Sequence, residues 1–234
     1  MKNTIKKILL VILVLFTTIN YAQTEGDTDW ASWNTVGVDY KLNNKLSFGF
    51  AGQLRFKENI SVVDEYFTEL SGAYKLFKGF KIGAGLRYIS ENDNTGNVQG
   101  YDNYFRFNID ASYKHQIKNF KLGYRLRYQN KNEIGVSYAE GDFVNQNLRF
   151  KTSIEYDINN WKLDPKFSAE IFNRFQEGKD NGFNKYRLTL GTDYNLKDFG
   201  KIGAFYRIEK ELNVDLPDTK NIVGLKYIYR FKNK

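Results

Sequence analysis

The chain of 234 residues contains no cysteine, two prolines, one methionine and one histidine. Without cysteine it forms neither a disulfide framework nor a thiolate metal site, and its N-terminal segment is followed by no lipid-acceptor cysteine. No Pro/Ser-rich linker or low-complexity tract interrupts the sequence, so we expect a single domain. Segments with the 3.6-residue period of an amphipathic helix are also lacking. The fold must therefore rest on strands.

Residues 1–22 have the organisation of an export signal. Lys2, Lys6 and Lys7 precede the apolar run "ILLVILVLF", and the small residue Ala22 stands before Gln23, as at a cleavage site. The run is shorter than the roughly 20 residues that a spanning helix needs, which favours a cleaved signal over an anchor. The expected mature domain is 23–234, and loss of the three lysines lowers the formal net charge from +8 to +5.

The stretch "FKLGYRLRYQ", residues 120–129, shows the pattern that dominates the rest of the chain. Its even positions carry Phe, Leu and Tyr, whereas its odd positions carry Lys, Gly, Arg and Gln. A period of two is the signature of a strand with chemically different faces. Eleven such segments are expected, at 30–42, 45–56, 66–76, 80–89, 104–114, 120–129, 148–158, 163–175, 185–196, 201–209 and 222–231.

The connections between these segments alternate in length. Short ones at "NN", "FKG", "HQIKN", "NNW" and "KDFG" alternate with longer polar ones at 57–65, 90–103, 130–147, 176–184 and 210–221. This rhythm is typical of a meander of hairpins with one tight rim and one rim of longer loops.

The amount of aromatic side chain decides which face points outward. Aromatic residues make up 17% of the chain, and a small barrel has an interior that ordinary side chains already fill. The rings therefore fit better against hydrocarbon, and most segments approach the roughly 9–11 residues that cross a bilayer as a tilted strand. Closure removes unpaired strand edges from the lipid. We expect an all-β fold, a transmembrane antiparallel up-and-down β-barrel in the outer membrane.

The count of eleven segments conflicts with the even number of strands that bacterial single-chain barrels normally have. Eleven segments suggest that the first is not a complete wall strand or that one strand has been missed. We therefore expect 10–12 strands.

Several stretches carry a family resemblance: "EYFTELSGAYKLFKGFKIGAGLRYI", "NFKLGYRLRYQ", "NKYRLTLGTDYNL" and "IVGLKYIYRF". With the export signal and the hairpin rhythm, they make nearly all of the mature chain resemble the domain-of-unknown-function 2490 family of outer-membrane β-barrel proteins. The resemblance implies an outer-membrane barrel and supplies no established catalytic residues.

Strand parity assigns a charged set to the inner face. The basic members are Arg55, Arg87, Arg106, Lys121, Arg125, Arg127, Arg149, Arg187 and Arg207. The acidic members are Glu69, Asp110, Glu155, Asp157 and Asp193, with Glu170 and Glu209 on the same parity. Rings of Lys and Arg favour anions in a pore, so one expectation is a narrow porin or channel for small anionic or sugar-like solutes. The alternative is a non-conducting structural or interaction barrel whose inner charges pair.

An enzyme is not expected, and a lipid-modifying outer-membrane enzyme is the least favoured alternative. The lone histidine, His115, falls in the short connection "KHQIKN", where a solvated surface residue is more common than a catalytic base. Glu155 and Asp157 share a face about 7 Å apart, but Arg149 and Lys151 on the same strand favour ion pairing. No metal or cofactor motif is found, and cations inside a barrel cannot follow a nucleic-acid backbone.

The last strand suggests how the barrel is assembled. Tyr227, Tyr229 and Phe231 share its lipid face and resemble the aromatic-ended signal that barrel-assembly machinery recognises. Three residues follow Phe231, so the signal is not strictly terminal. The expected partners are therefore outer-membrane lipid and the barrel-assembly machinery, with small anionic solutes as candidate ligands.

Overall fold

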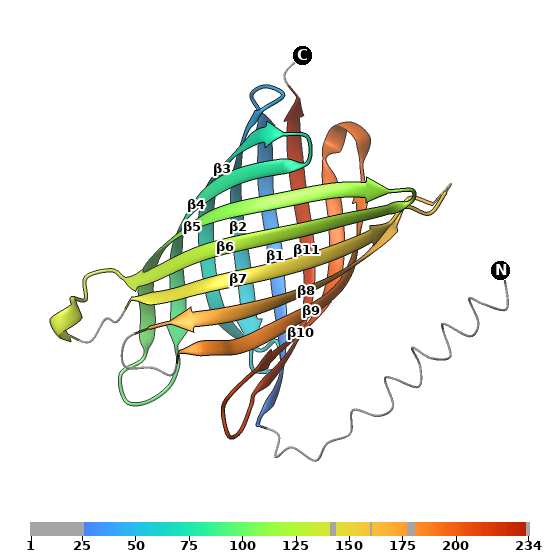
Figure 1. Cartoon of the computed structure of the whole chain (residues 1–234). Coiled ribbons are helices and arrows are strands. Elements are labelled where there is room, and N and C mark those ends of the chain that lie inside the picture. The colour runs from blue at the N-terminus through green and yellow to red at the C-terminus, as the bar shows by residue number, and fades with distance from the viewer. Residues whose placement is uncertain (1–25, 141–143, 160, 177–180, 233–234) are drawn as a thin grey trace, which may run out of the picture.

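A computed structural model describes residues 26–140, 144–159, 161–176 and 181–232, so the predicted signal at 1–22 lies outside the described residues. About three quarters of the described residues are strand (Figure 1). The strands are β1 (Thr28–Lys41), β2 (Leu46–Lys57), β3 (Val62–Phe77), β4 (Phe80–Asp93), β5 (Gly100–Ile117), β6 (Phe120–Glu133), β7 (Asn145–Tyr156), β8 (Asp164–Phe175), β9 (Gly182–Asn195), β10 (Lys201–Glu211) and β11 (Thr219–Lys232). Two short 3-10 turns, η1 (Tyr138–Glu140) and η2 (Lys197–Phe199), lie in connections. No helix of the described residues is long and apolar enough to cross a membrane.

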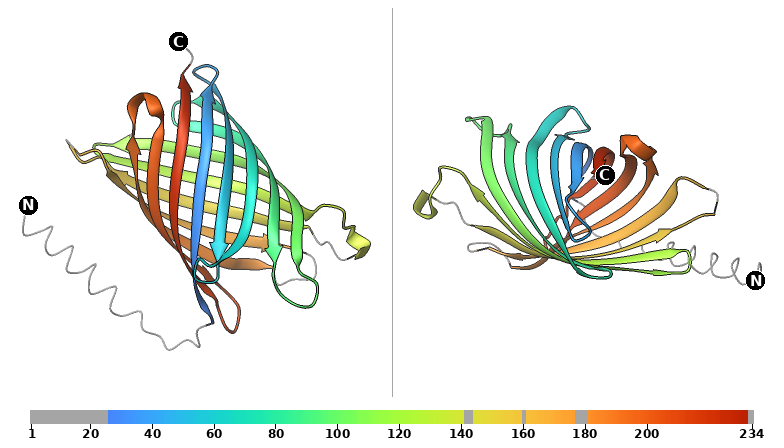
Figure 2. Two further views of the ribbon diagram at one scale, coloured as in Figure 1. Left: turned by 180° about the vertical axis from the view of Figure 1, so that it is seen from behind. Right: turned by 90° about the horizontal axis from the view of Figure 1, so that it is seen from above.

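The strands close into a barrel of antiparallel neighbours with one exception. β1 and β11 pair in parallel, in a register that runs from Thr28 opposite Thr219 to Lys41 opposite Lys232. Figure 2 shows β1 between β11 and β2. An odd number of strands requires this seam, because the first and last strands of an eleven-strand meander run in the same direction. Neither explanation offered for the odd count applies: β1 is a full wall strand paired along both edges, and the barrel closes with eleven strands.

The two rims differ as the sequence predicts. Residues 42–45, 78–79, 118–119, 157–163 and 196–200 connect strands at the turn rim, and residues 58–61, 94–99, 134–144, 176–181 and 212–218 connect them at the loop rim. Because β1 and β11 are parallel, β1 begins at the loop rim and β11 ends at the turn rim (Figure 1). The first and last strands therefore place the two ends of the barrel domain at opposite rims.

Several strands are longer than the hydrophobic alternation predicts, mostly toward the loop rim. β3 begins at Val62 rather than at 66, and β4 ends at Asp93 rather than at 89. The ladder continues because backbone hydrogen bonding does not need an apolar face. β5 likewise reaches Ile117, so His115 is a strand residue and not part of a turn, which corrects its predicted place. Its ring stacks between Tyr113 and Tyr124, with centroid distances of 5.6 and 5.9 Å.

The two faces of the wall have the predicted chemistry, with one correction. Large apolar side chains on the outer face are widely exposed, among them Val36 at 63% and Leu225 at 60%. Three aromatic side chains lie instead on the inner face and are buried: Trp33 and Phe172, which line the interior, and Phe67, whose ring lies under Arg87. The barrel interior thus contains rings as well as charges, and the expectation that the rings gather outside is only partly right.

Candidate functional site

The charged interior is the candidate functional site. Eight of the nine predicted basic residues line one cavity inside the barrel, here called the central cavity: Arg55, Arg87, Arg106, Arg125, Arg127, Arg149, Arg187 and Arg207. The ninth, Lys121, lies at the start of β6, beside the turn rim. Strand alternation explains this placement, because inner and outer side chains succeed one another along each strand.

Three of the predicted charged residues meet at the turn rim. Lys121 Nζ lies 3.1 Å from Glu155 Oε1 and 3.4 Å from Asp157 Oδ2. The two carboxylates therefore pair with one cation, as the alternative to acid–base chemistry predicts. Lys121 and Asp157 are more than a third exposed, so the pairing adds little stability.

On β3 to β6 the carboxylates of Glu69 and Asp110 hold three arginines. Glu69 Oε2 lies 2.6 Å from Arg87 Nη2 and 3.4 Å from Arg106 Nη2. Arg127 donates to both oxygens of Asp110, from Nε at 2.6 Å and from Nη2 at 2.7 Å. This fork-to-fork geometry is the strongest form of a charge-assisted pair.

Glu170 on β8 is the most enclosed carboxylate among these ion pairs. Its Oε1 lies 2.7 Å from Arg125 Nη2 and 2.9 Å from Arg149 Nη2, and its side chain is 6% exposed. Arg149 also donates from Nη1 to Gln129 Oε1 at 2.8 Å. One buried carboxylate thus holds two arginines from β6 and β7.

Asp193 on β9 and Glu209 on β10 are also each shared between two cations. Asp193 lies 2.8 Å from both Lys201 Nζ and Lys226 Nζ. Glu209 pairs with Arg187 and, at 3.2 Å, with Lys185.

Sequence reasoning missed Glu65, which lies 2.5 Å from Arg55. The sequence contained a signal for it: Glu65 and Glu69 are four positions apart on one strand, and residues an even number of positions apart share a face.

Arginine guanidinium groups lie over the faces of the inner aromatic rings, an arrangement that was not predicted from the sequence. The Arg187 guanidinium lies 5.1 Å from the Trp33 ring centroid and 4.6 Å from that of Phe172. Arg55 lies 3.7 Å from Trp33, and Arg149 lies 4.3 Å from Phe172. Cations over ring faces are stabilised by the ring quadrupole. Because Trp33 is on β1 and Phe172 on β8, the stack crosses part of the interior.

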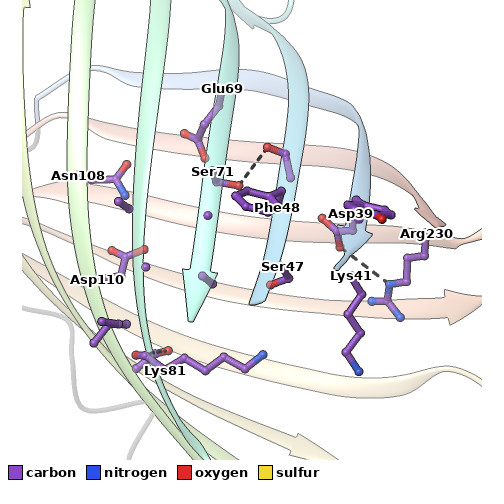
Figure 3. A pocket seen from close by; sticks show the side chains of 18 of the residues that line it. Asp39, Lys41, Ser47, Phe48, Glu69, Ser71, Lys81, Asn108, Asp110 and Arg230 are labelled. Carbon is purple, nitrogen blue, oxygen red and sulfur yellow. Dashed lines mark hydrogen bonds and ion pairs between the residues drawn. The ribbon is translucent and has the colours of Figure 1, made fainter. Parts of the chain in front are cut away.

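Two cavities inside the described barrel meet at Arg127. The central cavity has a volume of about 590 Å³. The other, here called the turn-side cavity, has a volume of about 720 Å³ and opens among the turn-rim halves of β1 to β5. In Figure 3, Asn108 and Asp110 line one side of it and Asp39 and Arg230 the other. Among the residues that the structure describes, Arg127 alone lines both cavities.

The aromatic residues predicted as an assembly signal lie along β11. Tyr229 and Phe231 meet edge to face with centroids 4.8 Å apart. The Tyr227 hydroxyl donates to the carbonyl of Phe199 in η2 at 2.6 Å. These contacts fix the rings at the turn-rim end of the parallel seam.

Within the described residues, no group of three or more His, Asp and Glu side chains is arranged to hold a metal ion. None of the curated proteins compared with the chain matches it. The sequence model of one family matches residues 30–215, which run from β1 through β10 and end before β11. The match covers well over half of the chain and agrees with the family resemblance of its strand motifs. The chain therefore belongs to the family described as "Protein of unknown function (DUF2490)".

Proposed function

We propose that this protein is an outer-membrane barrel that is closed at mid-height by paired inner charges, and that it works as a non-conducting binding barrel rather than as an open porin. The export signal and the apolar outer face support the location. Rings and aliphatic side chains such as Phe50 and Leu70, each more than half exposed, cover the outside of the wall. Such a surface is stable in lipid and would aggregate in water.

The burial of inward-facing charges carries the proposal. Glu170 and Arg149 face the inside of the barrel, yet their side chains are 6% and 8% exposed. In the wall of an open pore these groups would meet a water column. Here neighbouring arginines and rings cover them instead. A buried pair is costly to break because the partner is left as an uncompensated charge.

A narrow anion channel is the second candidate, and one observation favours it. The two cavities together follow much of the interior, and both reach Arg127. Movement of this side chain away from Asp110 would join them. A channel of this kind would be gated, with the closed state as its resting form.

An enzyme is disfavoured by the surroundings of the one histidine. His115 is paired with Leu122 on the outer face, and its ring lies between two tyrosines. The inner carboxylates lie on the opposite face of the wall. A nucleophile–base arrangement needs side chains within hydrogen-bond reach of one another.

Two measurements test the proposal separately. Cell fractionation should place the mature chain in the outer membrane, with a heat-dependent shift in gel mobility, whereas recovery as a soluble periplasmic protein would refute the location. Liposomes that contain the refolded protein should swell no faster in small sugars than empty liposomes. Swelling at porin-like rates would refute the closed interior.

A further inference from the structure

We propose that the central cavity binds one small multivalent oxyanion, such as a free phosphate-bearing solute, through Lys151, Lys166 and Arg207. This inference deepens the proposed function, because it names what a closed binding barrel would hold. It is argued from the position of the three cations, from the carboxylates around them and from the charge of the whole cavity.

The three cations come from strands on one side of the barrel. Lys151 is on β7, Lys166 on β8 and Arg207 on β10, and all three line the central cavity. Lys151 is attracted by Glu170 and repelled by Arg125, Arg207 and Lys166, so these charges share one region. Opposite Lys166 in the ladder stands Gly191, which adds no side chain to fill the space.

Each neighbouring carboxylate is already held by other cations. Glu170, opposite Lys151 in the ladder, is bound by Arg125 and Arg149. Asp193 is bound by two lysines, and Glu155, opposite Lys166, is bound by Lys121. Across the described part of the chain, none of the three proposed ligands forms a salt bridge.

Arg207 is fixed in orientation, and the terminal N–H groups of its guanidinium are left to bind a ligand. Its Nε donates to Thr189 Oγ1 at 2.9 Å, and its guanidinium lies 4.8 Å from the ring centroids of Trp33 and Phe205. These contacts orient the fork and use one of its five donors. A planar fork with free terminal N–H groups matches the oxygens of a phosphate.

The cavity as a whole has a surplus of positive charge. With Arg174 left aside, thirteen Lys and Arg residues and four Asp and Glu residues line it. Four further carboxylates pair with members of this set: Glu69, Glu91, Asp110 and Glu209. Thirteen basic side chains therefore face eight acidic ones, a surplus of five basic groups. Low-dielectric walls strengthen the attraction of such a surplus for anions.

Two buried donors without acceptors belong to residues that line the same cavity. Arg106 Nε and Arg125 Nε are buried and make no hydrogen bond in the described structure. Both residues line the central cavity, and the Arg106 side chain is 10% exposed. A buried donor without an acceptor is costly. A bound oxyanion, or a water molecule ordered by it, would supply acceptors for these N–H groups.

The geometry limits the ligand to a class. Three cations together favour a ligand with several charges over chloride, and the cavity volume of about 590 Å³ admits a small molecule of the size that protein pockets bind. The cations point into the barrel, and the wall separates them from surrounding lipid. The ligand is therefore a free solute and not a lipid headgroup.

Calorimetry on the full mature chain in detergent tests the inference, with sodium pyrophosphate as the probe and sodium chloride at matched ionic strength as the reference. The wild type should bind one pyrophosphate saturably and show no saturable heat with chloride. Lys151→Met, Lys166→Met and Arg207→Gln should each weaken binding at least about tenfold, the loss expected for one charged hydrogen bond. Lys151→Arg should retain binding. Lys78→Gln, in the turn between β3 and β4, removes one positive charge far from the cavity and should bind like the wild type.

Thermal unfolding without ligand separates loss of a ligand from loss of the fold. Lys151→Met relieves repulsion between cations, so its midpoint should equal or exceed that of the wild type while binding falls. Absence of saturable binding to the wild type, or binding by all three variants as tight as that of the wild type, would overturn the inference. Conductance recorded on the same preparation tests the closed barrel, so a conducting protein that binds pyrophosphate would refute only the proposed function.

Discussion

Arg127 and Asp110 stand directly opposite each other on β6 and β5, and two hydrogen bonds of 2.6 and 2.7 Å join the guanidinium to the carboxylate. Arg127 also lines both cavities of the interior. The pair therefore stands at the boundary between the turn-side cavity and the central cavity. Its side chains are 12% and 19% exposed, so water screens the charges little.

Arg127→Gln should destabilise the barrel by about 3–5 kcal/mol, because Asp110 is left buried and without its partner. Thermal unfolding in detergent, followed by the shift in gel mobility, measures the change. The double variant Arg127→Gln with Asp110→Asn removes both charges and should recover much of the loss. If the single and double variants unfold at the temperature of the wild type, the pair contributes nothing to closure.

Leu126→Arg places a charge on the outer face of β6, where the leucine is 46% exposed. At the bilayer midplane such a change costs about 2–4 kcal/mol. Folding into lipid vesicles over a urea gradient gives the value. Lys121→Arg, on the inner face of the same strand, is the matched control and should be neutral. A neutral result for Leu126→Arg would mean that this face does not meet lipid.

The parallel seam predicts that the two ends of the barrel domain are exposed on opposite sides of the membrane. One epitope placed directly before Gly26 and another after Lys232 should respond differently to antibody. With the longer loops outward, as in other bacterial barrels, the first should be labelled on intact cells and the second only after permeabilisation. Labelling of both from the same side would show that the closed barrel has an even number of strands.

Phe231→Ala should lower the amount of assembled barrel more than Phe231→Tyr does, because a ring at this position is the proposed recognition element for assembly. Phe231 is 49% exposed and meets Tyr229 edge to face. Quantitative blotting of the heat-modifiable form measures assembly. Equal assembly of the two variants would place recognition elsewhere in the chain.

Much of the interior follows from the sequence because parity and turn length together fix neighbouring pairs. The two-residue turn at 118–119 sets Asp110 opposite Arg127, so this contact is readable once the hairpin is recognised. Contacts between strands that are not neighbours in the sheet cannot be predicted in this way. Arg125 reaches Glu170 across β7, which depends on the curvature of the wall and on the length of the arginine side chain.

The inner rings and the seam escaped prediction for different reasons. Phe67 stands between Glu65 and Glu69 at a position of inner parity, but apolar character alone assigns such a ring to lipid. Arginines over its face and over Trp33 make these rings compatible with a charged interior. The parallel seam between β1 and β11 follows from a count of eleven strands, but the sequence alone makes the odd count look like an error, because bacterial single-chain barrels normally have an even number.

The most direct test of the closed interior is the conductance of the refolded protein in planar bilayers at about 0.1 M salt, where screening still leaves a Debye length near 10 Å. The buried pairs at mid-height, Glu170 with Arg149 and Asp110 with Arg127, predict no conductance steps above those of the bare bilayer. Steady anion-selective steps from the wild type, lost when Arg125 and Arg127 are both replaced by glutamine, would contradict a closed barrel and establish the channel.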